Sequence, residues 1–539
     1  MVRRHPEAIA RRLADRADEA VMLARLTRDL PGFLRSPLSI EEAIARVRRR
    51  LASREQHFLA SVERTIFGYS RSPYLKLLRH VGCTLGDLTR LVSHEGIEGA
   101  LSALLRQGVY VTFDELKGRS VAVRGSARFT FAPGDFDSPL TRAHYYTYTG
   151  GSRGKPVRIP RHFRYVEELS SGRGATVAAF GVEGARHVFW LTNPLTTMLL
   201  AKKLGGEAAL WVHPLRIFPT KGKLAARYFN VMGRLVNSSF PMPQLLEPGD
   251  ADRLVTWLVR QPHDGRPWVV DTVPSSAVRL AVAARDLGVS LEGVTFALQS
   301  EPVTEARYRH MVESGARVMA YYTSIEMSNV AASCALGSAA DDLHLFADRY
   351  ALVERERPLV EGGPGVRAML LTTLTDGIAT VAFNTELGDY ATVERRDCRC
   401  LLGDLGLTTH LSQIRSFEKL SGEGVTFARS NLLQILEEVL PRRFGGTALD
   451  YQLLEEEAAD SSTRLVLRVN PSVGGLDEAA LRATLLEELG RGGLVDRHHA
   501  ELLRRARSVT VSREPPLATM AGKVLPFQLQ RRIPDTSRP

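Results

Sequence analysis

Cysteine is scarce in this sequence, with four residues among 539. Four cysteines exclude a dense disulfide framework, and their scarcity suits the reducing cytoplasm. Long apolar runs are also lacking, since none reaches the ~18 residues that a membrane-spanning helix needs. The nearest run, residues 189–200, is interrupted by Thr192, Asn193 and Pro194. We therefore expect a cytoplasmic protein with no membrane span.

A strong excess of one charge is lacking too. Lys and Arg number 71 against 60 Asp and Glu, and the net charge of +11 is spread along the chain, which favours anionic ligands only weakly. The run from Arg46 to Arg50 has no nucleic-acid recognition motif beside it and is typical of a solvated helix face. Near the amino terminus, acidic residues alternate with the arginines and no apolar core follows. We expect no nucleic-acid partner and no export or transit peptide.

The length and patterning of the chain predict two domains. At 539 residues with 44% hydrophobic content, the chain is too long for a single core. Residues 1 to about 110 have helical patterns, including a capping box of Ser39 and Glu42. From about 120 to 400, short apolar runs alternate with helical stretches, which predicts an α/β domain with a largely parallel, helix-covered sheet. Its expected strands are His187–Thr192, Trp268–Val273, Val294–Leu298 and Arg317–Tyr322.

The last ~120 residues have a different character. Arg464–Val469 and Ser508–Val511 read as strands, and Asp477–Arg491 between them as an amphipathic helix. This pattern predicts a small α+β domain. We expect a large multi-layer α/β domain over 1–414, with a helical extension over about 1–110, and a small α+β domain over 415–539.

A glycine-rich loop at residues 149–156 combines hydroxyls, glycines and a lysine. Glycines let backbone N–H groups turn inward, hydroxyls donate further hydrogen bonds, and the lysine adds charge, so the loop is suited to a phosphate. It is neither a Walker loop nor a dinucleotide fingerprint, because both need glycine where Thr149 stands. Taken alone, it reads equally well as an ordinary hairpin turn. The candidate phosphate-binding residues are Thr149, Gly150, Gly151, Ser152, Gly154 and Lys155.

The order Thr-x-Gly-Ser-x-Gly-Lys-Pro in this loop resembles the signature loop of the adenylate-forming superfamily. That superfamily includes acyl-CoA ligases, amino-acid adenylation domains and luciferases. Similar motifs follow in the same order as far as about residue 525. The resemblance implies ATP and Mg²⁺ as reactants or cofactors, and a mobile carboxyl-terminal domain.

The expected strand Arg317–Tyr322 leads into Thr323-Ser324-Ile325-Glu326, which resembles the superfamily's Tyr-Gly-x-Thr-Glu element. The resemblance implies that Tyr322 packs near the adenine and that Glu326 helps to hold Mg²⁺. Ile325 replaces the hydroxyl residue that meets the α-phosphate, and Thr323 or Ser324 can compensate. Without the resemblance, Glu326 reads as a surface carboxylate.

The segment Leu298–Thr304 is similar to the Gly-Gly-Glu-Pro-Leu-Thr segment whose backbone lies against the adenine. The positions that the resemblance implies for this contact are Gln299, Ser300 and Glu301. The alternative is an N-capped helix, with Ser300 or Thr304 as the cap.

Three further residues complete the implied site. Phe383–Tyr390 resembles Tyr-Arg-Thr-Gly-Asp, so Asp389 is implied to accept the two ribose hydroxyls. Arg415 stands at the position implied to contact ribose or phosphates, followed by residues 417–419 in place of the usual hinge aspartate. Pro515–Leu525 is similar to the Pro-x-Thr-x-x-Gly-Lys loop, which implies Lys523 as the lysine that enters the site during adenylation.

The closest branch is that of phenylacetate-CoA ligase-like proteins and acyl-protein synthetases, to which Arg71–Tyr74, Gly108–Thr112 and Glu115–Gly118 are also similar. The branch implies activation of a small, aromatic or otherwise apolar carboxylic acid as an acyl-adenylate. A thiol of coenzyme A or of a pantetheinylated carrier protein then displaces AMP. Two alternatives stay open: amide or nitrogen–nitrogen bond formation in secondary metabolism, and a degenerate member that binds nucleotide or acyl groups without turnover.

The pair Cys398 and Cys400 is a possible metal site, because some relatives in this branch carry a zinc-binding cysteine cluster. Cys334 and either His344 or His410 can complete a four-ligand set. The spacing Cys-x-Cys is tighter than that of most zinc sites. Structural zinc and free thiols are therefore both compatible with the sequence.

Overall fold

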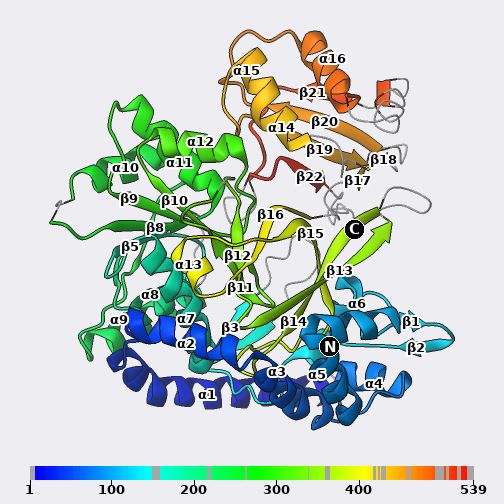
Figure 1. Ribbon diagram of the computed structural model, residues 1–539. Coiled ribbons are helices and arrows are strands. Elements are labelled where there is room, and N and C mark those ends of the chain that lie inside the picture. The colour runs from blue at the N-terminus through cyan, green and yellow to red at the C-terminus, as the bar shows by residue number, and fades with distance from the viewer. Residues whose placement is uncertain are drawn as a thin grey trace.

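The computed structural model describes most of the chain (Figure 1). The predicted phosphate loop, residues 417–419 and Lys523 lie outside the described residues. The residues described are 6–148, 158–214, 220–261, 264–337, 339–358, 365–416, 421–422, 425–426, 432–457, 463–491, 500, 503–504, 509–518 and 524–530.

The first part of the chain is helical, as the sequence predicts, and lies along the base of the large domain in Figure 1. Ser39 caps the second helix, where its Oγ accepts a hydrogen bond from the Glu42 N–H at 3.2 Å. The capping box is only half formed, because the Glu42 carboxylate accepts from Arg46 Nε at 2.9 Å instead. The helices are α1 (Pro6–Arg35), α2 (Ile40–Ala52), α3 (Arg54–Val62), α4 (Pro73–His80), α5 (Leu85–Arg106) and α6 (Phe113–Leu116).

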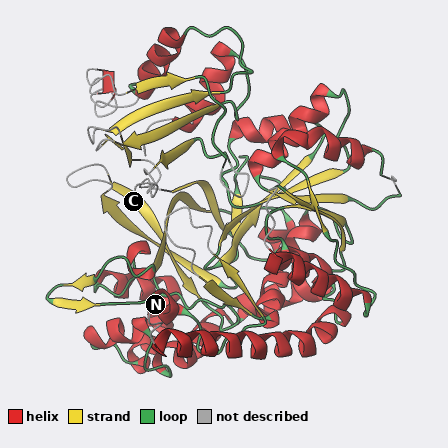
Figure 2. Ribbon diagram, turned by 180° about the vertical axis from the view of Figure 1, so that it is seen from behind, coloured by secondary structure: helices red, strands yellow, loops and turns green. Residues whose placement is uncertain are grey.

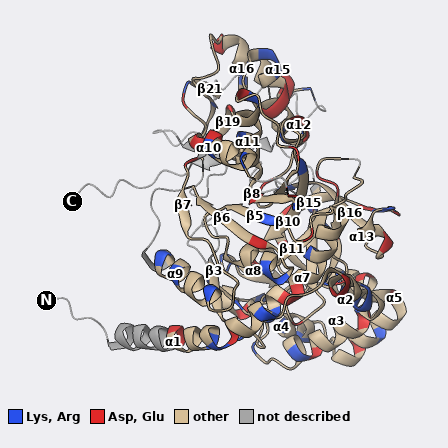
Figure 3. Ribbon diagram, turned by 90° about the vertical axis from the view of Figure 1, so that its left-hand side faces the viewer, with Lys and Arg blue, Asp and Glu red and all other residues tan. Residues whose placement is uncertain are grey.

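The basic run on α2 is paired with acidic residues. Arg46 and Arg49 both contact Glu42, and Arg50 Nη2 lies 2.5 Å from Glu168 Oε2 on a neighbouring helix. Figure 3 shows Lys and Arg mixed with Asp and Glu through the elements. Three of the four arginines in this run are thus in ion pairs with carboxylates.

A 12-stranded sheet forms the centre of the large domain, in the order β13-β14-β15-β16-β12-β11-β10-β9-β8-β5-β6-β7. The four predicted strands are β5 (Arg186–Trp190), β8 (Trp268–Thr272), β9 (Val294–Leu298) and β10 (Arg317–Ser324). From β10 to β7 all neighbours are parallel, and from β10 to β13 all are antiparallel. The expectation of a largely parallel sheet was therefore wrong for half of it, because β13 to β16 follow one another with almost no helix between them.

Helices cover the parallel half of the sheet, as the view from behind shows (Figure 2). Every residue of β8 and β9 is buried, which explains their nearly continuous apolar sequences. Asp271 is the charged exception, and its two oxygens accept from Arg173 Nη2 and His187 Nδ1, each at 2.6 Å. The covering helices are α7 (Phe163–Ala179), α8 (Leu195–Lys203), α9 (Thr220–Arg234), α10 (Ala251–Val259), α11 (Pro274–Asp286) and α12 (Glu305–Glu313).

The antiparallel half of the sheet and two hairpins complete the large domain. A further short helix, α13 (Leu401–Asp404), connects β15 to β16. The remaining strands are β1 (Ala122–Arg124), β2 (Ala127–Phe129), β3 (Tyr145–Tyr148), β4 (Arg158–Arg161), β6 (Glu207–His213), β7 (Pro243–Leu245), β11 (Ser328–Ser333), β12 (Leu343–Leu345), β13 (Tyr350–Pro358), β14 (Gly365–Thr373), β15 (Thr385–Arg395) and β16 (Thr409–Ser416).

The carboxyl-terminal part is a small α+β domain with its own hydrophobic core, placed above the sheet in Figure 1. Its four-stranded sheet has the order β21-β20-β19-β22. The predicted division at residue 414 stays a prediction, and β16 runs two residues beyond it. The elements are α14 (Leu432–Gln434), the π-helical turn η5 (Ile435–Val439), α15 (Leu440–Phe444), β19 (Tyr451–Glu457), β20 (Thr463–Val469), α16 (Glu478–Leu489), β21 (Val509–Ser512) and β22 (Phe527–Gln530).

Among the described helices, none combines the length and the apolar composition that crossing a membrane requires.

Candidate nucleotide site and cysteine cluster

The segment around Tyr322, which is predicted to pack near the adenine, lies at the carboxyl end of β10. Tyr322, Thr323 and Ser324 are its last residues, and the register with β11 shifts between Tyr322 and Thr323. Ser324 closes the following turn, since its Oγ accepts from the Met327 N–H at 2.9 Å. The carboxyl edge of parallel strands is where open α/β sheets bind ligands, and this turn lies at that edge.

Two residues predicted to contact the nucleotide are joined directly. The Tyr322 hydroxyl donates to Asp389 Oδ2 at 2.9 Å, although the two are 67 positions apart. Asp389 lies on β15, whose register pairs Tyr390 with Arg415 on β16. The structure therefore brings the predicted adenine and ribose positions into contact and places Arg415 on the strand next to Asp389.

Arg415 lies close to the carboxylate of Asp341. Its Nη1 is 3.6 Å from Asp341 Oδ2 and donates to the Ile414 carbonyl at 2.8 Å. Burial raises the pKa of Asp341, while the neighbouring Arg415 lowers it. The guanidinium is about one-fifth exposed, so it keeps access to solvent from this position.

Glu326, the predicted magnesium ligand, forms an ion pair with Lys117. Both side chains are largely buried, at 12% and 10% exposure. Lys117 follows α6, and its ammonium lies 5.3 Å from the centre of the Phe113 ring. The sequence analysis named residues 115–118 only for their similarity to one branch of the superfamily. The contact between Lys117 and Glu326 could not be predicted, because the two residues are 209 positions apart.

The Glu301 carboxylate is buried and accepts hydrogen bonds from neighbouring residues of the protein. Its Oε2 accepts from the Ser275 N–H at 3.0 Å and from Arg307 Nη1 at 2.8 Å. Ser300 has φ = 73°, in the left-handed region that favours glycine. The expected contact of residues 299–301 with adenine stays a prediction, while the helix-cap alternative is decided in favour of Thr304, which caps α12.

The cluster around Arg307 crosses the boundary between the domains. Arg307 Nε lies 3.0 Å from Glu437 Oε1 in η5, and its Nη2 donates to the Val524 carbonyl at 3.1 Å. The Val524 N–H donates to the Ser275 hydroxyl at 3.1 Å. Residue 524, which follows Lys523 in the sequence, is thereby fixed to the large domain.

The predicted phosphate loop connects two paired strands. In β3 and β4, Tyr148 pairs with Arg158 and Tyr145 with Arg161. The loop itself lies outside the described residues. Its flanks are therefore those of an antiparallel hairpin.

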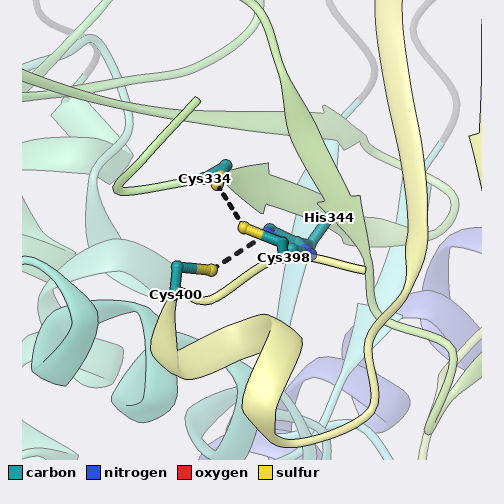
Figure 4. A group of neighbouring side chains, drawn as sticks. All are labelled: Cys334, His344, Cys398 and Cys400. Atoms are coloured by element: carbon teal, nitrogen blue, oxygen red, sulfur yellow. Dashed lines mark hydrogen bonds between the residues drawn. The ribbon is translucent and has the colours of Figure 1, made fainter. Parts of the chain in front are cut away.

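Three cysteines and one histidine meet at the β11–β12 and β15–α13 connections (Figure 4). The Sγ atoms of Cys334 and Cys398 are 3.3 Å apart, and Cys400 Sγ lies 3.1 Å from His344 Nε2. The four ligand atoms all lie within 4.8 Å of one another. Cys334, Cys398 and Cys400 are thus brought together as the sequence predicted.

The structure decides which histidine belongs to the cluster. His344 Nδ1 lies 2.6 Å from the Leu407 carbonyl, so Nδ1 carries the proton and Nε2 keeps its lone pair for a ligand. His410 is held elsewhere, with Nδ1 2.7 Å from Asp342 Oδ1. The alternative set that included His410 was therefore wrong, because β12 and β16 pair the two histidines but only His344 faces the thiols.

The tight Cys-x-Cys spacing is accommodated by a close turn. A Cβ on Gly403 would lie 2.0 Å from the Cys398 carbonyl oxygen, so only glycine fits there. Cys400 caps α13, and its Sγ accepts from the Gly403 N–H at 3.4 Å. Although burial raises it, hydrogen bonds from the Cys400 N–H and the Cys334 thiol lower the pKa of the Cys398 thiol overall. Three thiols and an imidazole are a ligand set of structural zinc sites.

No family model and no curated protein matches the chain. Among solved structures, it is similar to ATP-bound MatB from Rhodopseudomonas palustris, with 15% identity, a TM-score of 0.42, and coverage of 74% of this chain and 69% of the other. It is also similar to the anthranilate CoA ligase AuaEII in complex with anthranoyl-AMP, with 13% identity, a TM-score of 0.43, and coverage of 70% and 65%.

A third similar structure is the amide bond synthetase McbA from Marinactinospora thermotolerans, with 13% identity and a TM-score of 0.44. The match covers 92% of this chain and 98% of the other. Because every one of these TM-scores is below 0.5, we take the chemistry of the site from its own residues.

Proposed function

We propose that this chain is an ATP-dependent, AMP-forming ligase that activates a carboxylic acid as an acyl-adenylate. The observation that carries the proposal is the hydrogen bond from Tyr322 to Asp389 at the carboxyl edge of the parallel strands. It places an aromatic ring beside a carboxylate that can accept from a vicinal diol. Arg415 on the next strand and Glu326 on the adjoining turn supply charges of both signs for phosphates and a cation.

In the first step, an oxygen of the substrate carboxylate attacks the α-phosphorus of ATP, and pyrophosphate leaves. Asp389 holds the ribose, and Arg415 offsets charge that develops on the phosphates. Lys155 in the glycine-rich loop and Lys523 in the loop at 515–525 also offset charge on the phosphates, as the sequence resemblance implies. Glu326 is the residue that would hold Mg²⁺, which supplies further charge stabilisation when bound. Its carboxylate is held by Lys117 in this structure, so a cation must displace that contact.

In the second step, a thiolate attacks the acyl carbonyl, the carbonyl–phosphate bond breaks, and AMP leaves. We propose a thiol of coenzyme A or of a pantetheinylated carrier protein, with an apolar or aromatic acid, in the cytoplasm. An amine in place of the thiol would give an amide. Nitrite activated by ATP in place of the carboxylate, and then attacked by an amine that displaces AMP, would give a nitrogen–nitrogen bond. A binder without turnover is the second candidate, favoured by Ile325 at the hydroxyl position and by the Lys117–Glu326 ion pair.

Pyrophosphate release tests the proposal. The protein is incubated with ATP, Mg²⁺ and a panel of aryl, fatty and amino acids. We expect one acid class to give release that Lys523→Ala and Asp389→Asn each reduce at least a hundredfold. As a control, Lys76→Ala changes an exposed lysine on α4 and is expected to leave the rate unchanged. If ATP binds but no acid gives release, the chain is a binder.

We also propose that Cys334, His344, Cys398 and Cys400 hold a structural zinc ion. The fit rests on four ligand atoms within 4.8 Å and on the neutral Nε2 of His344. Metal analysis of the purified protein is expected to give about one zinc per chain, lost in Cys398→Ser. The matched control is Cys83→Ser, a buried cysteine outside the cluster. Absence of zinc from the wild-type protein, or equal loss in both variants, contradicts the proposal.

A further inference from the structure

Arg161, the last residue of β4, is a buried arginine with unused hydrogen-bond donors. It is 3% exposed, and its Nη2 donates to the carbonyl oxygen of Ile325. Its Nε and Nη1 meet no acceptor among the residues that the structure describes. The guanidinium lies over the Tyr165 ring, 4.4 Å from its centre. Buried donors of this kind are almost always satisfied in folded proteins.

Arg161 also differs from the other buried arginines in its charge balance. Within the described part of the chain, it forms no ion pair, whereas each of the others has a carboxylate within 4.0 Å. These partners are Glu115 for Arg124 at 2.9 Å, Asp271 for Arg173 at 2.6 Å, Glu301 for Arg307 at 2.8 Å and Asp348 for Arg349 at 3.7 Å. A buried cation without an ion-pair partner is unfavourable. The burial of Arg161 therefore suggests that its guanidinium binds an anion.

Asp137 is close enough to Arg161 for the guanidinium to lower its pKa, but the two form no ion pair among the described residues. Burial raises the pKa of Asp137 to about 6, although Arg161 and Arg158 lower it. Glu326, next to the Ile325 carbonyl, is paired with Lys117. One carboxylate, Asp137, therefore interacts with two arginines, Arg158 and Arg161, and this group keeps an excess of positive charge.

The position of Arg161 connects two elements of the proposed site. It ends the hairpin whose turn is the glycine-rich loop. Through its bond to Ile325 it contacts the turn that carries Glu326. An anion held by the unused N–H groups would thus lie beside the turn that carries Glu326, the residue to which the proposal assigns the cation.

We propose that Arg161 binds an anionic oxygen of a reactant, either a phosphoryl oxygen of the nucleotide or the carboxylate of the acid. Both groups present oxygens that accept charge-assisted hydrogen bonds from a guanidinium. Desolvation inside the protein strengthens such bonds. The inference rests on the proposed function for the identity of the reactants. The binding of an anion by Arg161 is inferred independently of the proposed function.

The test compares Arg161→Met with Arg158→Met, a change of an exposed arginine on the same strand. Calorimetry measures binding of pyrophosphate and of inorganic phosphate, and pyrophosphate release gives the KM for the active acid. If the anion is a phosphoryl group, Arg161→Met weakens pyrophosphate binding at least tenfold. If it is the carboxylate, the KM for the acid rises at least tenfold and pyrophosphate binding is unchanged. Arg158→Met alters neither.

Thermal unfolding separates a binding role from a structural one. Without ligand, Arg161→Met is expected to melt at or above the wild-type temperature, because an unpaired buried cation is removed. A large fall in melting temperature with unchanged affinity for every probe overturns the inference, as does a wild-type protein that binds none of the probes. If no acid gives pyrophosphate release but pyrophosphate binding falls in Arg161→Met, the anion site stands and the ligase proposal fails.

Discussion

Replacing Arg307 with methionine is expected to release the carboxyl-terminal domain from the large domain. Arg307 lies between Glu301 and Glu437, with side chains that are 1%, 0% and 1% exposed. The two hydrophobic cores are separate, so this polar cluster carries much of the contact between the domains. Methionine would leave two buried carboxylates without the ion pairs that they make with Arg307.

The expected cost follows from the burial of the group. Removing one partner from a buried ion pair costs about 3–5 kcal/mol, which lowers the docking equilibrium roughly a hundredfold to several thousandfold. Small-angle X-ray scattering measures the result as an increased radius of gyration. Arg309→Met, on the same helix but half exposed and 3.9 Å from Glu305, is expected to cost below about 1 kcal/mol.

A triple variant checks the physical cause. Combining Arg307→Met with Glu301→Gln and Glu437→Gln removes the charges that the single variant leaves buried. Because uncompensated charge is the source of the cost, the triple variant is expected to recover most of the docking. The reasoning is refuted if Arg307→Met has the same radius of gyration and melting behaviour as Arg309→Met.

Three further predictions concern the site. Lys117→Ala leaves the Glu326 carboxylate without its ion pair, so the Mg²⁺ concentration for half-maximal pyrophosphate release should fall severalfold; an unchanged or higher concentration contradicts this. Tyr322→Phe removes the donor to Asp389 and should raise the Kd for ATP roughly tenfold, since a hydrogen bond to a charged group contributes about 1.5–3 kcal/mol; calorimetry measures it. The pKa of Asp137 is raised to about 6 in the folded state against 3.8 unfolded. The folded state therefore keeps a proton that the unfolded state has lost, and stability falls as pH rises through this window. The stability of Asp137→Asn relative to wild type should increase by about 1 kcal/mol from pH 5 to pH 7 in urea unfolding, and a constant difference would show that Asp137 titrates normally.

Local patterns in the sequence were sufficient for four of the six strands in the parallel half, β5, β8, β9 and β10, and for the helical first part of the chain. Trp268–Thr272 and Val294–Leu298 are short apolar runs because both of their faces are covered, and that burial can be read from the residues themselves. The antiparallel half could not be read in this way. Its strands lie in long hairpins, and which strand pairs with which depends on contacts across the whole sheet.

The sequence by itself determined the α/β class and the small carboxyl-terminal α+β domain, and it offered the three cysteines only as a possible cluster. Only the tertiary structure decided that His344 and not His410 faces those thiols, that Lys117 holds Glu326, and that Arg161 is buried with two donor nitrogens that meet no acceptor among the described residues. The physical reason is the range of the interactions. Periodicity and capping act over a few residues, whereas an ion pair or a ligand set is made by side chains that meet only when distant strands and loops pack together.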